Sequence, residues 1–469
     1  MRVHFIGVSG TAMAGVALMM RKLGHTVQGS DTAFYPPMGP MLKEQGVATL
    51  TGYRPENITP DLNLVVVGNV CRRDNPEVVE AQRLGLLLLS MPQVIERFFL
   101  ADKHALVVTG THGKTSTTAL LAWMLEEAGM DPSFMVGGIA LNFQSNHKIG
   151  DGSYFVIEGD EYDTAFFDKK AKFFHYKPLH AAITSLEYDH ADIYPDLSSI
   201  EQTFHSFAEM IPVQGSLSCC TDWPVLWRIA DACAGEVVRY GTDETALVAA
   251  RQMSAGESGT TFQLTLDGGQ RWHDATLALW GRHNVLNSLA AASLASRAGA
   301  DVESIVRAMA TFKGVWRRMQ VWAQAADVTI VDDFAHHPTA VTETLKACVS
   351  RFPGRRVLAV YHFESNTSRR RIFQAEYGQA FRGAQAVFLT HPLVKADALS
   401  ADQYLDPFEV VARVREYADH AGAWSDFQGI CDAIVAYAKP GDVVLGMSGR
   451  DLSPLYELLV PALQASRER

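Results

Sequence analysis

A glycine-rich stretch near residue 110 has the composition of a loop that binds phosphate groups. Its residues are Gly110, Thr111, His112, Gly113, Lys114, Thr115 and Ser116. A predicted strand precedes it and a helical pattern follows, so backbone N–H groups at the helix start can converge on phosphate oxygens. The Lys114 ammonium would neutralise β- and γ-phosphates, and the Thr115 hydroxyl would suit Mg²⁺. The usual spacing has a further glycine where this chain has Val108, yet the flanking elements favour a nucleotide site over a capped turn.

Acidic side chains follow two apolar runs that predict strands downstream of this loop. The first group is Glu158, Asp160, Glu161 and Asp163, and the second group is Glu187, Asp189, His190 and Asp192. Carboxylates at the carboxyl ends of strands stand where α/β sheets bind ligands, and Mg²⁺ prefers oxygen ligands. We expect Glu158 to hold a metal ion and its three acidic neighbours to be structural. His190 fits two roles equally, a contact to a metal or acyl group and an ordinary hydrogen-bonded histidine.

Polar residues later in the chain suit the base and ribose of a nucleotide. Asn284 and Asn287 stand one helical turn apart at the head of an alanine-rich helix, where they could pair with an adenine edge or cap the helix. The stretch GVWRRM contributes Arg318, and VDDFAHHP places Asp333 at the end of another predicted strand. A carboxylate there can hold ribose hydroxyls, although each pattern is weak in isolation.

The N-terminus predicts a strand, a glycine-rich turn and a helix. The turn GVSGTAMAG is not G-x-G-x-x-G, because Gly7 and Gly10 are three residues apart. Asp31 lies 24 residues after Gly7, about where a ribose-binding acid stands in dinucleotide sites. A dinucleotide-dependent oxidoreductase is therefore one interpretation, but hydride transfer has no use for a second nucleotide loop near residue 110.

Strand–turn–helix patterns begin three times, and this alternation predicts an α/β fold with parallel sheets. We expect three domains, with boundaries near residues 102 and 324. In the first domain, the helix after the turn should carry Met13, Val16, Ala17 and Met20 on one face. In the second, the segment 235–275 is typical of antiparallel strands inserted into the domain.

Composition narrows the class of protein. The 469 residues are 48% hydrophobic and 20% charged, as in globular proteins, and the net charge of −11 argues against a general binder of nucleic acids or acidic membranes. The six cysteines form no C-x-x-C pair, which fits a reducing cytoplasm without disulfides or a zinc site. The glycines in the apolar N-terminal stretch argue against a targeting segment, and no apolar run is long enough to span a membrane.

Taken in order, these motifs resemble the Mur ligase family of ATP-dependent amide-forming enzymes over essentially the whole chain. GTHGKTSTT matches the family's shortened phosphate loop, so the absent glycine follows the family pattern. The stretches HNVLNSLAA and DDFAHHP and the pair Asp189–His190 also match in position. YPPM at 35–38, GNVCRRDNPE at 68–77 and DEYDTAFFDKKAKFFHY at 160–176 resemble the branch that attaches a murein tripeptide to UDP-N-acetylmuramic acid in cell-wall recycling.

The resemblance implies a role for each of three domains. Residues 1–102 would form a Rossmann-like domain that binds the UDP-sugar, residues 103–324 a P-loop ATPase-like domain that binds ATP and Mg²⁺, and residues 325–469 a Rossmann-like domain that receives the tripeptide and closes over the site. The implied UDP-sugar residues are Ser9, Gly10, Thr11, Asp31 and Asn69. The implied ATP-binding residues are the whole loop 110–116, Asn284, Asn287, Arg318 and Asp333. The implied metal ligands are Thr115, Glu158 and His190, the implied catalytic residues are Lys114, Glu158, His190 and Arg318, and the implied peptide contacts are His336 and Arg370.

Two features bear on the branch. No lysine lies between Ser185 and Ile211, so the chain lacks the carbamylated lysine of several Mur ligases, as the alanine-adding and recycling branches do. The chain has FESNTSRRR at 363–371 where the recycling branch usually has FEPRSNT, which leaves open which of Arg369, Arg370 and Arg371 meets the peptide carboxylate.

Several alternatives stay open at this point. They are a ligase that adds L-alanine alone or glutamate to a folate, and an inactive UDP-sugar-binding module. The base that accepts the amine proton could be His190, His336 or His337. We expect a monomer or weak homodimer with small-molecule substrates.

Overall fold

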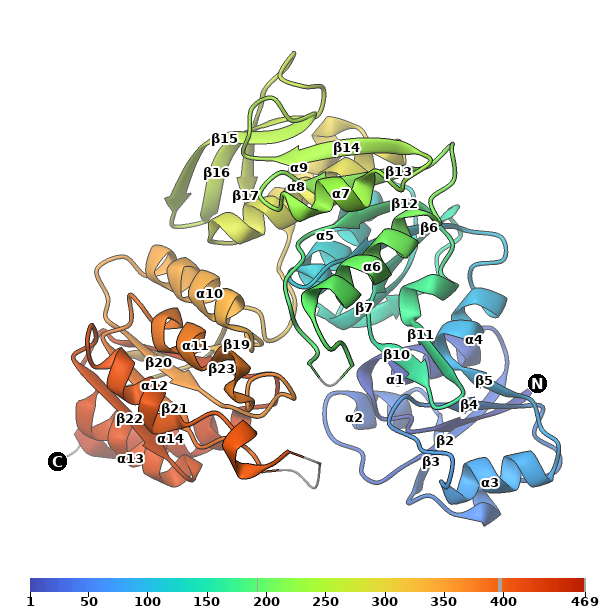
Figure 1. Cartoon of the computed structure of the whole chain (residues 1–469), viewed down its shortest axis with the longest axis horizontal. Helices are drawn as coiled ribbons and strands as arrows, with labels where there is room; N and C mark the ends of the chain where they lie inside the picture. Colours follow the sequence, from blue (N-terminus) through green and yellow to red (C-terminus); the bar gives the residue numbers. More distant parts are fainter. Residues whose placement is uncertain (192, 395–398, 468–469) are drawn as a thin grey trace.

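The computed structural model describes residues 1–191, 193–394 and 399–467. It forms three lobes that follow one another along the chain, with the N-terminus and the C-terminus on opposite sides (Figure 1). Each lobe is built on its own mostly parallel sheet, which confirms the predicted α/β class. Among the described residues, no helix has the length and apolar character needed to cross a bilayer.

The first sheet has five parallel strands in the order β3-β2-β1-β4-β5. Its strands are β1 (Arg2–Ile6), β2 (Thr26–Asp31), β3 (Ala48–Thr51), β4 (Leu64–Val67) and β5 (Leu88–Ser90), and its helices are α1 (Thr11–Lys22), α2 (Met38–Glu44), α3 (Pro76–Arg83) and α4 (Met91–Phe98). The chain order reverses between β1 and β4, and ligands of open parallel sheets bind at such a point.

The four residues that were predicted to share one face of α1 are all buried. Every residue from Met13 to Met20 is buried, so the helix buries more than one face. The reason is tertiary, because β7 (Ser133–Ala140) and β8 (Ser145–Lys148) of the central lobe cover the side of α1 that faces away from its own sheet. The Asn146 side chain donates a hydrogen bond of 2.8 Å to the Thr11 carbonyl across this junction.

The central sheet has ten strands in the order β17-β16-β15-β14-β13-β12-β6-β9-β7-β8. Besides β7 and β8, the strands are β6 (His104–Thr109), β9 (Tyr154–Gly159), β12 (Pro178–Ile183), β13 (Ser216–Cys220), β14 (Glu236–Gly241), β15 (Val248–Gly256), β16 (Gly259–Thr265) and β17 (His273–Leu277). The helices are α5 (Lys114–Glu127), α6 (Leu197–Ala208), α7 (Val225–Ala230), α8 (Arg282–Arg297) and α9 (Val302–Thr311), with a hairpin of β10 (Asp163–Ala165) and β11 (Asp168–Ala171) beside them.

The segment 235–275 is only partly as predicted. β15, β16 and β17 are antiparallel to one another, as expected. β14 is instead parallel to β13, and the short pairing of β14 with β15 is parallel as well. The antiparallel strands therefore extend the edge of the main sheet, because the β14–β15 pairing joins them to it.

The third sheet has six strands in the order β18-β19-β23-β20-β21-β22, and only the β18–β19 pair is antiparallel. The strands are β18 (Gln320–Ala325), β19 (Val328–Asp333), β20 (Val357–Tyr361), β21 (Ala386–Thr390), β22 (His420–Trp424) and β23 (Val443–Met447). The helices are α10 (Pro338–Arg351), α11 (Gln374–Ala380), α12 (Pro407–Val414), α13 (Phe427–Tyr437) and α14 (Ser453–Arg467).

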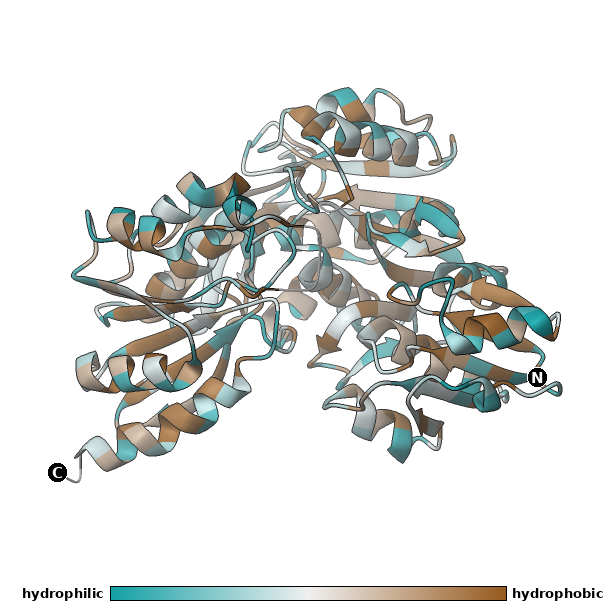
Figure 2. Ribbon diagram, turned by 60° about the horizontal axis from the view of Figure 1, so that its bottom comes forward, coloured by the Kyte–Doolittle hydropathy of each residue, from teal (hydrophilic) through white to brown (hydrophobic). Residues whose placement is uncertain are grey.

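The hydrophobic cores connect the first lobe with the central lobe, whereas the third lobe has cores of its own. One core runs without interruption from the α1 side of the first sheet through the central lobe, whereas the third sheet has a separate core on each face. Figure 2 shows hydrophobic residues along the strands and mixed polarity along the surrounding helices. The first two lobes therefore share an apolar junction. The third contacts the central lobe through polar groups, described below, and through Trp280, which packs against the third-lobe core.

Candidate functional site

The loop between β6 and α5 requires its glycines. Gly113, just before α5, has φ +80, and Gly110 has φ +124, both in the left-handed region that favours glycine. A Cβ on Gly113 would stand 2.2 Å from Oδ1 of Asn287, and a Cβ on Gly110 would meet Thr184. The loop therefore packs tightly against α8 and the end of β12, with its backbone at the N-terminus of α5.

A buried ion-pair network joins the loop to the two acidic segments. The Lys114 ammonium donates to Glu161 at 2.9 Å and to the Gly110 carbonyl at 2.7 Å. Nε2 of His190 lies 2.9 Å from the same Glu161 carboxylate. Burial opposes the charged form of His190, but its hydrogen bond to Glu161 and the Asp189 charge together raise the pKa of the imidazole. Glu161 thus bridges two groups that both favour a positive charge.

Thr115 and Glu158 form an oxygen-rich pair beside this network. The Thr115 hydroxyl donates to Oε1 of Glu158 at 3.0 Å, and the Gly137 backbone N–H donates to Oε2 at 2.8 Å. Burial, reinforced by the Asp160 charge, raises the pKa of Glu158. A hydroxyl beside a half-buried carboxylate fits a divalent cation such as Mg²⁺, because a cation would offset the cost of burying the charge.

Parallel strand pairing brings these residues together. β9 pairs with β6 so that Gly159 is opposite Thr109, and β12 pairs with β6 so that Ile183 is also opposite Thr109. The three segments that leave these strands therefore start at one edge of the sheet. Because this register joins residues 47 positions apart, as in the Lys114–Glu161 pair, sequence spacing alone does not reveal the role of Glu161.

The two asparagines of α8 lie at the same place. The Asn287 amide donates to Oδ1 of Asn284 at 3.3 Å, and the Asn284 amide donates to the Trp280 carbonyl at 2.8 Å. Neither bond caps the free N–H groups at the helix start. Both side chains instead line the cavity described below, next to the phosphate loop.

Asp333 is held firmly at the end of β19. Its oxygens accept the backbone N–H groups of Met319 at 2.7 Å and Ala335 at 2.8 Å, and the Thr344 hydroxyl at 3.2 Å. Arg318 lies over the Phe334 ring at 4.9 Å. Burial lowers the pKa of Arg318, although the charges of Asp333 and Glu158 oppose this effect.

One cavity of about 1480 Å³ collects residues from all three lobes. The predicted residues that line it are Thr11, Thr111, His112, Gly113, Lys114, Thr115, Ser116, Glu158, His190, Asn284, Asn287, Arg318, Asp333 and His336. The predicted residues outside its lining are Ser9, Gly10, Asp31, Asn69, Gly110 and Arg370. The structure thus brings most of the expected ATP-binding residues together in this cavity, whereas most of the expected UDP-sugar-binding residues lie outside its lining.

Asp31 ties down the turn after β1. One of its oxygens accepts the Ser9 backbone N–H at 2.9 Å and the Ser9 hydroxyl at 2.5 Å, and the other accepts the Thr32 backbone N–H at 2.7 Å. Asn69 is exposed just beyond the end of β4, at the reversal point of the sheet.

The three consecutive arginines of the FESNTSRRR segment differ in environment. Arg369 is 2% exposed and lies near the Tyr404 hydroxyl, while Arg371 pairs with Glu409 at the surface. Nε of Arg370 donates to the Asn366 carbonyl at 3.0 Å. The same segment reaches the central lobe, because the Thr367 hydroxyl donates to Asp189 at 2.7 Å.

Glu187 is a second acid whose role the sequence leaves undefined. Its carboxylate contacts His112 of the phosphate loop at 2.6 Å and accepts the Thr339 hydroxyl of α10 at 2.9 Å. Asp192, named with the same acidic group, lies outside the described residues.

Comparison with known families gives three adjacent matches. The profile described as Mur ligase family, catalytic domain, matches residues 2–103. The Mur ligase middle domain matches residues 108–295, and the Mur ligase glutamate ligase domain matches residues 317–450.

Individual relatives match over nearly the full length. UDP-N-acetylmuramate–L-alanyl-gamma-D-glutamyl-meso-2,6-diaminoheptandioate ligase of Escherichia coli is 35% identical over 100% of this chain and 99% of its own length. UDP-N-acetylmuramate–L-alanine ligase of Chlorobium phaeobacteroides is 34% identical over 97% of this chain and 96% of its own. The crystal structure of a murein peptide ligase from Psychrobacter arcticus is 32% identical, with a TM-score of 0.75 and 99% of each chain covered.

Proposed function

Since the chain belongs to the Mur ligase family of ATP-dependent ligases that form C–N bonds, we propose that it joins L-alanyl-γ-D-glutamyl-meso-diaminopimelate to UDP-N-acetylmuramic acid. The observation that carries the proposal is the full-length similarity to a ligase of that name. The cavity of about 1480 Å³ supports it, because a typical pocket for one small ligand measures about 300–1,000 Å³. A site shared by a nucleotide, a nucleotide-sugar end and a peptide needs this larger space.

In this proposal ATP lies along the phosphate loop. The backbone N–H groups of residues 113–116 contact the phosphates, because Ser185 already accepts those of Thr111 and His112. Lys114 exchanges its ion pair with Glu161 for the β- and γ-phosphates. Asn284 and Asn287 face the adenine, and Arg318 approaches the γ-phosphate. Asp333 approaches the ribose, with the acceptor capacity left by its three protein hydrogen bonds.

Mg²⁺ would be held by Thr115 and Glu158, with His190 as a further ligand. The ion would neutralise charge that builds on the transferring phosphoryl group. His190 must lose its proton to bind a metal, and its contact with Glu161 opposes that loss. Displacement of Lys114 from Glu161 by ATP changes the charge around this histidine at the same time.

The reaction follows from the weakness of a carboxylate as an electrophile. A carboxylate oxygen of the sugar bonds to the γ-phosphorus of ATP while the bond to ADP breaks, which gives an acyl phosphate. The peptide amine nitrogen then bonds to the carbonyl carbon, and the bond to phosphate breaks as the nitrogen loses a proton. Lys114 and Arg318 stabilise the phosphoryl charge, and positioning supplies much of the rest.

The geometry favours His336 among the three histidines that could accept the amine proton. Its Nδ1 donates to the Phe334 carbonyl at 3.0 Å, which leaves Nε2 as the acceptor in a side chain that lines the cavity. Burial lowers the pKa of His336, so the ring is neutral. His190 instead favours its charged form, and Nε2 of His337 is directed at the Tyr188 carbonyl.

The nucleotide end of the sugar substrate belongs at the reversal point of the first sheet. Ser9, Gly10 and Thr11 follow β1, and Asn69 follows β4, so these residues lie beyond the carboxyl ends of two paired strands, where the chain order of the sheet reverses. Thr11 also lines the shared cavity, which connects this place to the phosphate loop. Asp31 contributes by fixing the turn through Ser9.

The expected setting is the cytoplasm, with ATP and small-molecule substrates, without nucleic acid or membrane partners, as a monomer or weak homodimer. Domain boundaries near residues 102 and 324 belong to the same proposal. Light scattering at several protein concentrations measures the oligomeric state directly.

Phosphate release from ATP tests the function. Purified protein receives Mg²⁺, ATP and UDP-N-acetylmuramic acid, with the tripeptide, with L-alanine or with neither, and the mass of the nucleotide sugar is measured. The proposal expects release and a mass increase equal to the tripeptide minus water. Turnover with L-alanine alone would instead favour the second candidate, an L-alanine ligase, which the 34% identity to the Chlorobium enzyme supports.

A further inference from the structure

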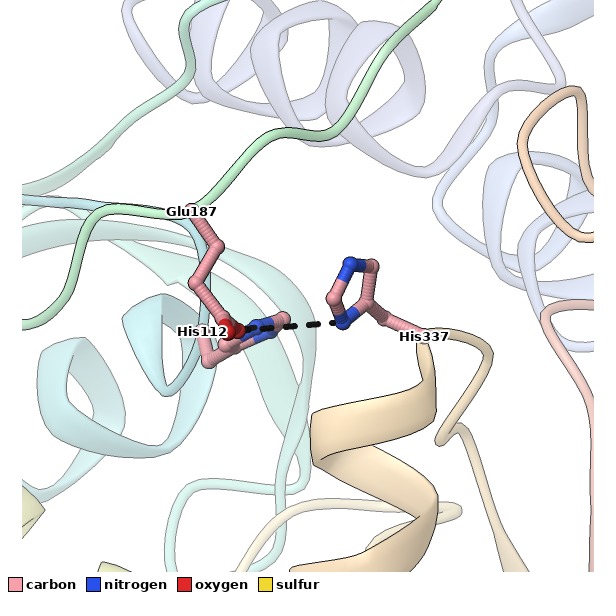
Figure 3. A group of neighbouring side chains, drawn as sticks. All are labelled: His112, Glu187 and His337. Atoms are coloured by element: carbon pink, nitrogen blue, oxygen red, sulfur yellow. Dashed lines mark hydrogen bonds and ion pairs between the residues drawn. The ribbon is translucent and has the colours of Figure 1, made fainter. Parts of the chain in front are cut away.

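We propose that His112, Glu187 and His337 form a binding site for a transition-metal ion of the Zn²⁺ class, separate from the Mg²⁺ site at Thr115 and Glu158. The three side chains point toward one another from different parts of the chain (Figure 3). His112 lies in the phosphate loop, Glu187 follows β12, and His337 is the N-cap of α10. The proposal does not depend on which reaction the protein catalyses.

The distances suit one small ion. Nε2 of His112 lies 2.6 Å from Oε2 of Glu187, and Nδ1 of His337 lies 3.8 Å from the same oxygen. One ligand atom from each residue lies within 4.8 Å of the others. In a tetrahedral site with metal–ligand bonds of about 2.0–2.1 Å, the ligand atoms are about 3.3 Å apart. Side-chain shifts of about 1 Å therefore bring all three atoms to that spacing.

The kinds of ligand atom select the metal. Two imidazoles and one carboxylate are a set that Zn²⁺ accepts, whereas Mg²⁺ prefers oxygen ligands. Three protein ligands also leave a fourth position for water or a substrate atom. The two imidazoles distinguish this cluster from the Mg²⁺ site, where Thr115 and Glu158 offer oxygen atoms and only His190 offers a nitrogen.

Neighbouring groups hold the ligands in the required orientation. Nε2 of His337 lies 3.3 Å from the Tyr188 carbonyl, a bond that puts the ring proton on Nε2 and leaves the Nδ1 lone pair facing Glu187. Oε1 of Glu187 accepts the Thr339 hydroxyl at 2.9 Å, which leaves Oε2 for the metal. The Thr339 backbone N–H also points at Nδ1, but at 3.4 Å this contact is long and a metal would replace it.

The backbone around the ligands is fixed as well. The Ser185 hydroxyl accepts the His112 backbone N–H at 2.9 Å, and Thr111 accepts the Glu187 backbone N–H at 2.9 Å. His337 is 4% exposed, so its position is set by packing. In the metal-free form, the proton shared by His112 and Glu187 occupies the place of the ion, and metal binding would release it.

An occupied site would fasten the phosphate loop to the third lobe. His112 belongs to the loop before α5, and His337 begins α10, so one ion would connect the central sheet to the C-terminal sheet. Metal binding should therefore raise the unfolding temperature of the whole chain, because the ion binds the folded state only.

Metal binding to the full chain, without substrates, tests the proposal. Protein freed of metal by a chelator is titrated with Zn²⁺ in competition with a chromophoric chelator in millimolar Mg²⁺, and with Co²⁺ while its visible absorption is recorded. The expected result is one ion per chain, with the intense visible bands of four-coordinate Co²⁺. Absence of a stoichiometric ion, or its displacement by Mg²⁺, would overturn the proposal. This measurement on the unmodified chain decides the question even if a variant fails to fold.

Matched variants locate the ion. Glu187→Gln keeps an acceptor for Thr339 but removes the charge, and His337→Asn keeps a good helix N-cap but removes the imidazole. Each should weaken Zn²⁺ binding by about 100-fold or more, beyond the usual cost of losing a neighbouring group. His205→Asn removes an exposed imidazole on α6 that has Glu209 beside it, and should leave the ion in place. Loss of the ion in His205→Asn, or its retention in both cluster variants, would contradict the assignment.

Discussion

Lys114 has two partners that a nucleotide must displace or share. Glu161 and the Gly110 carbonyl hold the ammonium at 2.9 and 2.7 Å. Burial alone would disfavour the charge, but Glu161 and then Asp160 raise the pKa of Lys114. The residue therefore stays charged and positioned at the start of α5, ready to meet phosphate oxygens.

Replacing Lys114 should slow turnover far more than it changes folding. We expect Lys114→Met to reduce kcat for phosphate release by about 10²–10³, because one preorganised positive group is lost from the transferring phosphoryl. Lys172→Met is the matched control, since Lys172 also forms a partly buried ion pair, with Asp160 at 2.9 Å, but does not line the cavity. Similar losses in the two variants would contradict a specific role for Lys114.

Replacing Glu158 should change the requirement for Mg²⁺. With Glu158→Gln, the Mg²⁺ concentration that gives half-maximal phosphate release should rise at least about 10-fold, because a charged ligand becomes neutral. Asp163→Asn serves as the control, since Asp163 pairs with exposed Lys169. An unchanged Mg²⁺ requirement in Glu158→Gln would remove this residue from the metal site.

Among individual residues, the sequence identified those whose chemical type and local motif already indicate a role in the site. Lys114, Thr115 and Glu158 follow from a loop motif and a strand end, and the structure brings them into one cavity. Glu161 and Glu187 could not be singled out, because their partners are fixed by strand register and by contact between lobes. An acid in a run of acids has no local signal that separates a bridging carboxylate from a solvated one.

At the scale of elements, α5 and its two ends illustrate how a helix serves the site. Gly113 precedes its first turn and Gly129 follows its last turn, and both have positive φ. Only Gly113 has a close neighbour, because the position of its missing Cβ is 2.2 Å from Asn287, whereas nothing lies within 4 Å of that position at Gly129.

This difference separates backbone strain from damage to the site. Gly129→Ala should lower the free energy of unfolding by about 1–2 kcal/mol through its left-handed conformation, with little effect on the KM for ATP. Gly113→Ala should cost at least as much and also raise that KM, because Asn287 or the loop must move. Denaturant unfolding and ATP titration measure the two effects. An equal KM for ATP in both variants would show that the contact with Asn287 does not shape the site.

Helices and strands could be predicted where residues close together in the sequence determine them. The strand, loop and helix at 104–127 follow from local periodicity and turn residues. The burial of α1 on more than one side could not be predicted, because a helical pattern shows which positions are apolar but does not identify a second sheet that covers the helix. β14 was mistaken for an antiparallel strand because alternation within a strand is the same for both pairing directions.

At the scale of the whole molecule, neutral histidines that are buried or half-buried are distributed over two lobes. Burial lowers the pKa of His147, His180, His283 and His362 to about 4 each. The unfolded value is about 6.5, so between pH 6.5 and 4 the unfolded chain binds more protons than the folded chain. Stability must therefore fall as the pH is lowered through this range.

Thermal unfolding followed from pH 7 to pH 4.5 checks this expectation. The midpoint should decrease steadily on acidification, and the decrease should be smaller in His180→Asn, because one group that must ionise is gone. His180 suits the test since it is 8% exposed and bonds Ser216, away from the cavity. Ordinary carboxylates titrate near pH 4 and contribute below about pH 5.5, so the change between pH 7 and about 5.5 reports the histidines. A midpoint that is flat over this range would contradict the assignment of neutral buried histidines.

At the scale of the whole molecule, three sheets surround one cavity, and the proposed reaction depends on this architecture. The first lobe presents Thr11, the central lobe the phosphate loop, and the third lobe His336 and Asp333, all to the same space. In the proposed function, three ligands would meet there and residues of the third lobe would select the amine. The choice between L-alanine and the tripeptide as the amine therefore tests the proposed function most directly.

A competition assay measures that choice directly. The protein receives ATP, Mg²⁺ and UDP-N-acetylmuramic acid with equal concentrations of L-alanine and the tripeptide L-alanyl-γ-D-glutamyl-meso-diaminopimelate, and mass spectrometry determines the ratio of the two products at early times. The account predicts that the tripeptide product predominates by at least about 100-fold, since the third lobe is proposed to bind the peptide beyond its first residue and 100-fold requires only about 2.7 kcal/mol of additional binding. A product mixture in which L-alanine equals or exceeds the tripeptide would contradict it.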